Sequence, residues 1–196
     1  MLKDVVTKIF QELEQSPEYL AFRQIPKKRK TIAGAEDLAG KKVALESENQ
    51  KWVVWKPKTG KPVLLAREPE NENDTLAILW KLEALGGLPF KQFQTLGHAG
   101  YGPDLIVHFQ EDNQSNPDRY ASIEAESRFY NYTAHGHTPS LYPRVICWDV
   151  GSSPKMRITP TDKAYKVIAE GKGFQVHVYC IRKMDGVQVL TRSQLE

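Results

Sequence analysis

The chain has no long apolar run, and it contains only two cysteines. A helix that spans a bilayer needs roughly 20 consecutive apolar residues, so the sequence predicts no membrane span. Residues 1–6 lack the apolar run and the small-residue cleavage site of a secretory signal. Cys147 and Cys180 cannot form a disulfide framework, and both lie in apolar runs, where cysteine usually behaves as a small buried hydrophobe. These absences favour a protein of the reducing cytoplasm.

The sequence also lacks a strong excess of charge of either sign. Its formal net charge is +3 at pH 7 and its pI is about 8.7. A mildly basic balance permits a polyanionic partner without demanding one. With 196 residues, 40% of them hydrophobic, the chain can build one domain with a real core. The terminal pair Leu195-Glu196 is common in vector-derived sequence, so we expect an excised domain of a longer protein.

The first 70 residues predict a helix followed by a β-meander. Residues 4–14 place apolar side chains at helical spacing. Three short β-rich runs separated by turn residues follow, at residues 42–45, 52–55 and 63–65. We therefore expect residues 1–70 to form an extension that binds nucleic acid or a protein partner.

Two features of this extension are compatible with nucleic-acid contact. A run of four basic residues includes Lys28 and Arg29. Such a run is more often a solvated loop than a binding site, and nucleic-acid contact is the alternative. The lysines interleaved with Trp52 and Trp55 leave a similar choice. They belong either to a flap whose tryptophans pack inward, which we favour slightly, or to a surface that grips phosphates and stacks on bases.

The remainder, residues 71–196, alternates helix and strand. Asn73 or Asp74 can cap a helix over residues 75–85, which a glycine pair closes. The other predicted elements are strands at residues 105–109, 120–126, 144–149 and 175–181 and helices at residues 127–134 and 161–170. This order predicts an α/β or α+β fold with a central mixed sheet flanked by helices.

Strand periodicity gathers carboxylates on one side of the predicted sheet. Alternate side chains of a strand face opposite ways, so Glu124 and Glu126 share a face, roughly 6–7 Å apart. If the preceding strand pairs with theirs as a hairpin, Asp104 reaches the same small space. Glu83 lies in an apolar stripe of the helix before these strands, where a charge is seldom placed unless it is paired or bound to a cation. A partner distant in the sequence is the alternative explanation for Glu83.

Converging carboxylates are easiest to explain as a cation site. Mg²⁺ is a hard cation that proteins usually hold with one or two carboxylates. One or two such ions help to make a nucleophile from water and clamp the attacking and leaving oxygens of a phosphodiester. Without a cation, the close like charges would repel and raise one another's pKa. The sequence therefore predicts Mg²⁺, for which Mn²⁺ can substitute.

Two motifs resemble the signature of the PD-(D/E)XK nuclease superfamily. They are GPDLI at residues 102–106 and IEAE at residues 123–126, which lie at the usual strand-to-strand distance. Similarity to one bacterial branch continues in three short runs, SRF at residues 127–129, HGH at residues 135–137 and VICW at residues 145–148. Members of that branch often occur as modules of larger proteins, some of them in phage defence. The resemblance covers roughly residues 75–150.

The resemblance implies a restriction-endonuclease-like core with Asp104, Glu124 and Glu83 as metal ligands. These three and Glu126 would be the catalytic residues of an Mg²⁺-dependent endonuclease acting on DNA, with RNA left open. The enzyme would be the nuclease module of a bacterial restriction or phage-defence protein. One departure is that the family's usual Lys is Glu126 here, as in some restriction endonucleases that still cleave DNA. In that position Glu126 acts as a general base or binds a second metal.

Weaker candidates for nucleic-acid contact follow the acids. Arg128 suits a bidentate contact to phosphate or ordinary solvation, and Asn131 lies close to it in sequence. His135 and His137 suit phosphate contact or proton transfer near neutral pH, with a role in capping their loop as the alternative. Their spacing, with no cysteine nearby, is poor evidence for zinc.

The missing lysine also supports a different class of function. A catalytically inactive nucleic-acid-binding module would keep the fold without turnover, and a scaffold domain would need no nucleic acid at all. Cutting both strands of a duplex usually needs two sites. An active enzyme is therefore compatible with a homodimer or with a partner that supplies an ATPase or regulatory domain.

Overall fold

The computed structural model describes residues 40–43, 47, 49–98, 103–111, 118–141, 143–152 and 156–195. The chain divides into two compact units, residues 1–47 and residues 48–196. In the first unit the described part contains a helical segment at residues 40–43, whose side chains are exposed. The predicted helix at residues 4–14 lies outside the described residues. The elements that position the candidate site all belong to the second unit.

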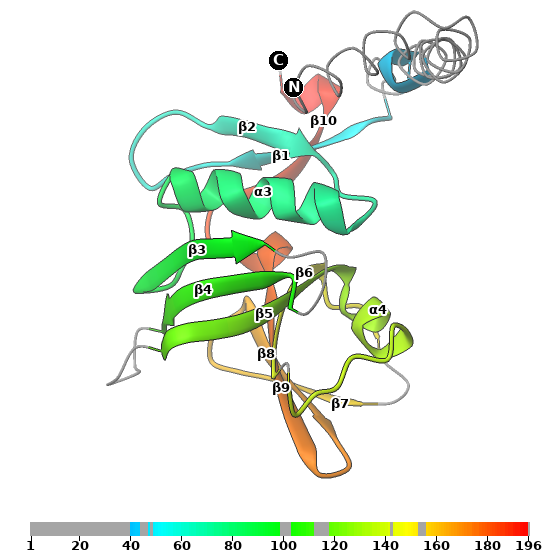
Figure 1. Ribbon diagram of the computed structural model, residues 1–196. Helices are drawn as coiled ribbons and strands as arrows, with labels where there is room; N and C mark the ends of the chain where they lie inside the picture. Colours follow the sequence, from blue (N-terminus) through cyan, green and yellow to red (C-terminus); the bar gives the residue numbers. More distant parts are fainter. Residues whose placement is uncertain are drawn as a thin grey trace, which may run out of the picture. The chain divides into compact units, whose positions relative to one another are not determined.

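The second unit is a mixed α+β structure built mostly of strands (Figure 1). In chain order its elements are β1 (Lys51–Trp55), β2 (Val63–Arg67), α3 (Glu72–Ala84), β3 (Gln92–His98), β4 (Leu105–Gln110), β5 (Asp118–Arg128), α4 (Phe129–Ala134), β6 (Arg144–Asp149), β7 (Arg157–Pro160), β8 (Lys166–Gly171), β9 (Phe174–Cys180), η1 (Ile181–Lys183), β10 (Val187–Thr191) and η2 (Arg192–Gln194). Among the described residues, no helix is long and apolar enough to cross a bilayer.

The strands form two sheets with α3 between them (Figure 1). The smaller sheet has the order β10-β1-β2 and is antiparallel. The larger sheet has the order β3-β4-β5-β6-β9-β8-β7, in which β5–β6 and β6–β9 are parallel and the other pairs are antiparallel. The predicted mixed sheet is therefore confirmed.

Helix α3 is capped by Asn71 at its N-terminus and is followed by Gly86 at its C-terminus. The side chain of Asn71 accepts a hydrogen bond from the Asp74 N–H at 3.0 Å and so caps the first turn. The predicted cap at Asn73 or Asp74 is wrong, because both residues already lie inside the helix. Gly86, with a φ of +67°, turns the chain out of the last turn, as the glycine pair predicts.

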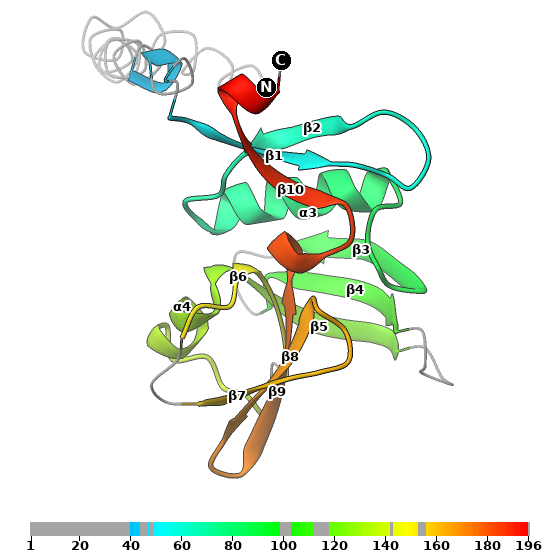
Figure 2. The same cartoon turned by 180° about the vertical axis from the view of Figure 1, so that it is seen from behind.

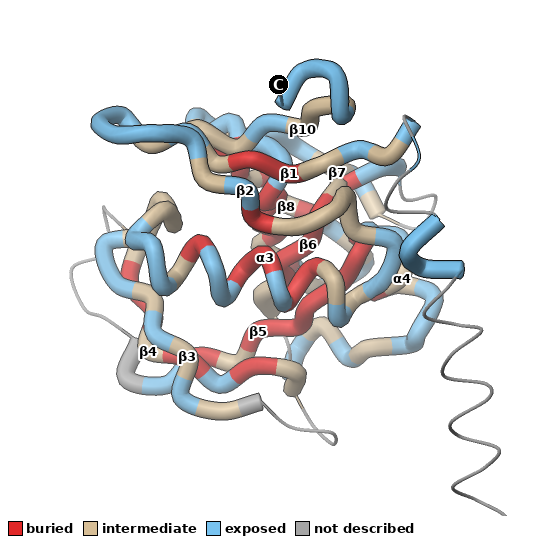
Figure 3. The backbone as a smooth tube through the Cα atoms, turned by 90° about the horizontal axis from the view of Figure 1, so that it is seen from above, coloured by how far each residue is buried: buried red, intermediate tan, exposed pale blue. Residues whose placement is uncertain are grey.

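The main core surrounds α3. Leucines of this helix pack against both sheets, and the buried positions follow α3, β5 and β6 in Figure 3. The core members that represent the helix, the smaller sheet and the larger sheet are Leu76, Leu79, Leu82, Val53, Leu65, Leu105 and Ile123. Burying one such side chain contributes about 1.5–3 kcal/mol, so α3 joins the two sheets into one unit. A second core joins α4 to residues of β6, β8 and β9.

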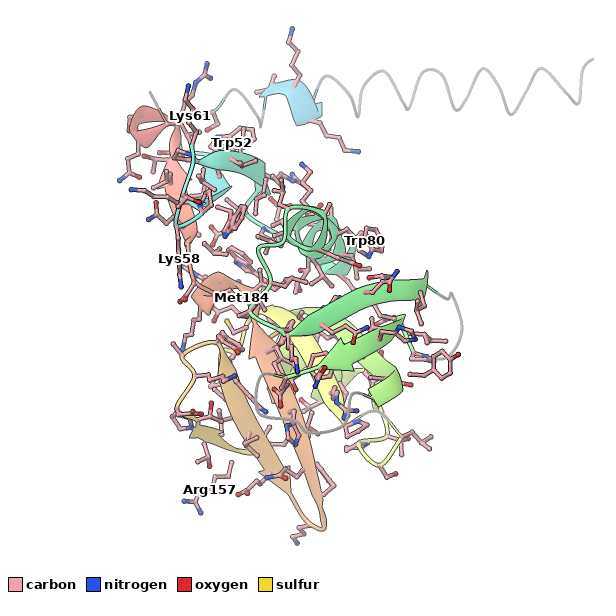
Figure 4. All side chains as sticks on the ribbon, turned by 90° about the vertical axis from the view of Figure 1, so that its left-hand side faces the viewer. Trp52, Lys58, Lys61, Trp80, Arg157 and Met184 are labelled. Carbon is pink, nitrogen blue, oxygen red and sulfur yellow. The ribbon has the colours of Figure 1, made fainter. Side chains whose placement is uncertain are left out.

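The tryptophans of β1 are half-buried rather than displayed. Trp55 packs against the main core, in agreement with the inward-packed interpretation. Trp52 lies on the smaller sheet, whereas Trp80 is 39% exposed on the side of α3 that faces away from the core (Figure 4). The structure therefore gives no support to a surface on which Trp52 and Trp55 stack on bases.

The N-terminal meander differs from the prediction in its third strand. Residues 42–43 are helical, so a strand at residues 42–45 is wrong there. The position beside β1 belongs to β10, which pairs with it from Lys51↔Thr191 to Trp55↔Val187 (Figure 2). Strands β1 and β2 thus belong to the same compact unit, residues 48–196, as the strands that follow α3.

The helix predicted at residues 161–170 is also wrong. Strand β8 occupies the second half of this segment and forms a hairpin with β9. Val167 and Ala169 are buried, whereas Ile168 between them is half-buried, which is the alternation of a strand. The hairpin turns at Gly173, whose φ of +80° suits glycine.

Candidate metal centre

The pairing of β4 with β5 brings Asp104 to Glu124. Their register ends with Leu105 opposite Ile123, so the next step places Asp104 opposite Glu124. Asp104 Oδ2 accepts a hydrogen bond from the Ala125 N–H at 2.8 Å, in place of a further main-chain pair. The predicted hairpin is confirmed, and it fixes the Asp104 carboxylate at the point where the two strands separate.

The two faces of β5 differ as its alternation predicts. Ile123 and Ala125 belong to the core around α3. Glu124 and Glu126 face the other way and meet the loop that follows α4, where His137 lies within 3.6 Å of both carboxylates. One strand therefore contributes apolar packing on one side and two acids on the other.

Glu124 is the least satisfied polar group of the site. Its side chain is 1% exposed, and neither carboxylate oxygen has a hydrogen-bond donor among the described residues. Burial, a hydrogen bond with the Asp104 side chain and the Asp104 charge raise the pKa of Glu124 to about 8. Two carboxylates can hydrogen-bond only by sharing a proton, so the ionised pair has no donor for Glu124. A cation between Asp104 and Glu124 would supply the positive charge that stabilises both carboxylates in the ionised form.

Glu126 is equally buried but is paired with histidines. Its side chain is 2% exposed, and Oε1 lies 3.1 Å from His135 Nδ1 and 3.5 Å from His137 Nε2. Burial raises the pKa of Glu126 to about 7, while the charge of His135 and its hydrogen bond act in the opposite direction. In contrast to Glu124, Glu126 has partners that can donate to it.

The ring of His137 is held by aromatic stacking. It stacks on Tyr132 with centroids 5.2 Å apart and planes 11° apart, and Tyr132 stacks on Phe129. Burial lowers the pKa of His137, which favours the neutral ring. Burial and the charge of Glu124 raise the pKa of Tyr132 to about 12, so Tyr132 is a neutral support for His137. In the sequence, only its place in a short apolar helix distinguishes Tyr132.

Glu83, the acid predicted on the helix, has hydrogen-bond donors of its own. Both oxygens of Glu83 accept hydrogen bonds from Thr95, one from the backbone N–H and one from the hydroxyl, each at 2.7 Å. The helical charge that raises the pKa of both Glu124 and Glu126 is Glu72, in the first turn of α3. A helix rises about 1.5 Å per residue, so Glu83 lies roughly 16 Å farther along the axis than Glu72. The structure therefore brings Asp104, Glu124 and Glu126 together and leaves Glu83 out. An acid in the first turn of a helix is ordinary, and nothing in the sequence marked Glu72.

A polar cleft with a volume of about 780 Å³ begins where β5 enters α4. Its lining residues include Lys51, Glu68, Glu70, Ser127, Arg128, Asn131, Trp148, Asp149 and Arg182. Most of its cations are paired, because Glu68 lies 3.7 Å from Lys51 and 3.6 Å from Arg182. Cationic and anionic residues are balanced in this cleft, which makes it polar rather than basic.

Arg128 differs from Lys51 and Arg182, the other cations of this cleft, because it has no acidic partner among the described residues. Its side chain is exposed at the N-cap of α4 and makes no hydrogen bond or ion pair with any described residue. Asn131, the other predicted contact in the cleft, donates from Nδ2 to the Ser127 hydroxyl at 3.1 Å. Lys28 and Arg29 lie outside the described residues.

Two sets of ligand atoms are therefore available. Asp104 and Glu124 offer oxygen atoms, which suit a hard cation such as Mg²⁺. Glu126, His135 and His137 offer one oxygen and two nitrogen atoms, all within 4.8 Å of one another. No protein-family model matches the chain, and neither a curated protein nor a solved structure is significantly similar to it. The chemistry of the site is thus inferred from its own geometry.

Proposed function

We propose that this chain is a metal-dependent endonuclease of the PD-(D/E)XK superfamily that hydrolyses phosphodiester bonds in DNA. The observation that carries the proposal is the buried Glu124 carboxylate, which lacks hydrogen-bond donors and lies beside Asp104. The order of elements supports it, because the hairpin of β4 and β5 is followed by α4 and the parallel strand β6. This order agrees with a restriction-endonuclease-like core, in which the acids lie on two neighbouring strands.

Asp104 and Glu124 would hold the ion, with Mg²⁺ as the expected cofactor and Mn²⁺ as a substitute. When bound, the ion supplies positive charge that neutralises the scissile phosphate and makes water easier to deprotonate. The protein orients Asp104 through the Ala125 N–H and excludes bulk water from Glu124 by burial. Both ligands are thus positioned before substrate arrives.

Glu126 takes the place of the superfamily's usual lysine. Its Oε1 faces His135, whose side chain is 56% exposed. One role for this pair is to accept a proton from the attacking water and release it to solvent through His135. The other role is to bind a second ion, for which the two histidines supply the remaining ligands.

Arg128 would position the substrate backbone. It is an exposed cation without a partner in the described structure, two residues along β5 from Glu126. A guanidinium in this place can donate two parallel hydrogen bonds to a phosphate. Asn131 borders the same cleft and would contact the sugar-phosphate backbone near it.

Cleavage of supercoiled plasmid by the purified chain tests the proposal. We expect nicking and linearisation with Mg²⁺ or Mn²⁺, and none with excess chelator. Asp104→Asn and Glu124→Gln should abolish cleavage. Asp162→Asn and Glu170→Gln are matched controls, because both side chains are exposed on the β7–β9 part of the sheet, and they should cleave like the unmodified chain.

Each other outcome of this assay has a definite meaning. Cleavage that persists in chelator, or in both site variants, contradicts the metal mechanism. Salt-dependent DNA binding without cleavage favours the inactive nucleic-acid-binding module, since phosphate contacts release counterions. A parallel assay on single-stranded RNA separates a ribonuclease from a deoxyribonuclease. Cleavage of both strands that rises steeply with protein concentration would indicate a homodimer.

A further inference from the structure

A second group of ligands lies on the histidine side of the acids. Glu126 comes from β5, and His135 and His137 come from the turn after α4. One oxygen of Glu126 faces His135 Nδ1 at 3.1 Å and His137 Nε2 at 3.5 Å. The three ligand atoms lie within 4.8 Å of one another, close enough to converge on one ion after small side-chain movements.

The local sequence fixes this turn in place. His135 is the C-cap of α4, where its N–H donates to the Asn131 carbonyl at 2.8 Å. Gly136 follows with a φ of +73°, a backbone conformation that favours glycine. The chain then returns so that His137 stacks on the buried Tyr132. Two histidines separated by one glycine are thereby directed at the same carboxylate.

Glu124 provides an independent observation that points to a ligand. Its carboxylate is buried and without donors, and Oε2 lies 3.6 Å from His137 Nδ1. This distance is longer than a hydrogen bond, but it places the carboxylate on the side of the ring opposite to Nε2. A carboxylate at one ring nitrogen favours the proton there and leaves the other nitrogen as a better metal ligand.

We propose that Glu126, His135 and His137 form a site for a divalent transition-metal ion, distinct from the position between Asp104 and Glu124. Imidazole nitrogen suits Zn²⁺, Co²⁺ and Fe²⁺, whereas Mg²⁺ prefers oxygen. Three protein ligands leave a coordination position open, which is the arrangement of catalytic rather than structural sites. The inference assigns Glu126 to ion binding rather than to proton transfer, and the binding does not depend on DNA cleavage.

Cobalt binding followed by visible absorption tests this site directly. The full chain is stripped with chelator and titrated with Co²⁺, whose absorption reports nitrogen and oxygen coordination. We expect a saturable band that Zn²⁺ removes and that a large excess of Mg²⁺ leaves in place. His135→Ala, His137→Ala and Glu126→Gln should each weaken Co²⁺ binding by at least about tenfold.

His108→Ala is the matched control, because this histidine lies on β4 and its ring faces Tyr120 rather than the acids. It should bind Co²⁺ like the unmodified chain. His135→Ala is the decisive variant, since the His135 side chain is more than half exposed and its removal leaves the core intact, which thermal unfolding verifies. Unchanged Co²⁺ affinity in folded His135→Ala, or full displacement by Mg²⁺, would overturn the proposal.

Asp104→Asn separates this inference from the proposed nuclease activity. It should lose plasmid cleavage and keep the Co²⁺ band. A chain that binds Co²⁺ through the histidines but never cleaves nucleic acid would retain the metal site and reject the nuclease. A chain that cleaves with Mg²⁺ but gives no Co²⁺ absorption band would retain the nuclease and reject the histidine metal site.

Discussion

Two carboxylates in this molecule, the half-buried Glu83 and the buried Glu124, have opposite surroundings. At the C-terminal end of α3, Glu83 accepts two hydrogen bonds from Thr95 and joins the helix to β3. At the junction of β4 and β5, Glu124 has no donor and faces Asp104. The first arrangement is complete within the protein, and the second needs a group from outside it. An acid in an apolar stripe is therefore ambiguous in the sequence, and its donors decide whether it stabilises the fold or binds a ligand.

The largest expected effect is the loss of cleavage in Glu124→Gln, on the order of 10²–10³-fold, as for other groups that stabilise developing charge. The same variant removes a buried charge without donors, so its unfolding temperature in chelator at pH 8 should not fall. Plasmid cleavage and thermal unfolding, measured on one preparation, check the loss of activity and the unchanged unfolding temperature. A stable variant with undiminished cleavage would remove the distinction between the two carboxylates.

The pH dependence of the metal-free protein provides the next test. The pKa of Glu124 is raised from 4.5 to about 8 and that of Glu126 to about 7. The folded chain therefore binds more protons than the unfolded chain between about pH 4.5 and pH 8, and its stability should fall as pH rises through this window. The expected loss is on the order of a few kcal/mol.

Urea unfolding in chelator between pH 5 and pH 8.5 measures this loss. Mn²⁺ should raise the free energy of unfolding more at pH 8 than at pH 5, because the ion replaces the protons at high pH. Glu124→Gln should flatten the profile. A free energy of unfolding that is constant between pH 5 and pH 8.5 would contradict the raised pKa values of Glu124 and Glu126.

Glu83→Gln is expected to have the opposite pattern of effects from Glu124→Gln: it should lower the free energy of unfolding and leave cleavage unchanged. The amide keeps one acceptor and loses the charge, which weakens the bonds from Thr95 and costs about 1–2 kcal/mol. Denaturant unfolding gives the cost, and the plasmid assay should agree with the unmodified chain within about twofold. A cleavage defect as large as that of Glu124→Gln would place Glu83 back in the site.

The smallest expected effect belongs to Arg128. Arg128→Ala removes one cation that has no partner among the described residues. We expect weaker DNA binding at all sequences and a salt dependence whose slope falls by about one counterion. Fluorescence anisotropy at several salt concentrations measures both. Lys58→Ala, on the loop between β1 and β2 (Figure 4), is the control and should leave the slope unchanged.

The hairpin that positions Asp104 and Glu124 was predictable because its signal is local. Ala121, Ile123 and Ala125 alternate with polar residues along β5, and all three are buried in the core around α3. That alternation fixes which face each acid takes. The pairing partner then follows from the short, polar connection between the two strands.

The elements that were missed depend on distant pairing. Val167 and Ile168 fit a helical stripe as well as a strand, and only the neighbouring strand β9 decides between them. Strand β10 is short and half-buried, and its partner β1 lies near the other end of the described chain. Helical periodicity alone predicts Glu83 as a site residue, because its hydrogen-bond donor, Thr95, lies on a later strand. The sequence makes His135 and His137 candidates for phosphate contact or proton transfer, and that role stays a prediction. Their shared contact with Glu126 arises from the turn at Gly136.

The pairing of β10 with β1 sets the order in which the protein can be completed. Strand β1 is the central strand of the smaller sheet. It pairs with β2 along one edge and with β10 along the other. During synthesis it must wait for almost all of the described chain to leave the ribosome before that second edge is covered. Such long-range closure slows folding. Until it occurs, the unpaired backbone N–H and C=O groups along this edge of β1 remain available to other nascent chains. Chaperone dependence should therefore be greatest just before β10 emerges.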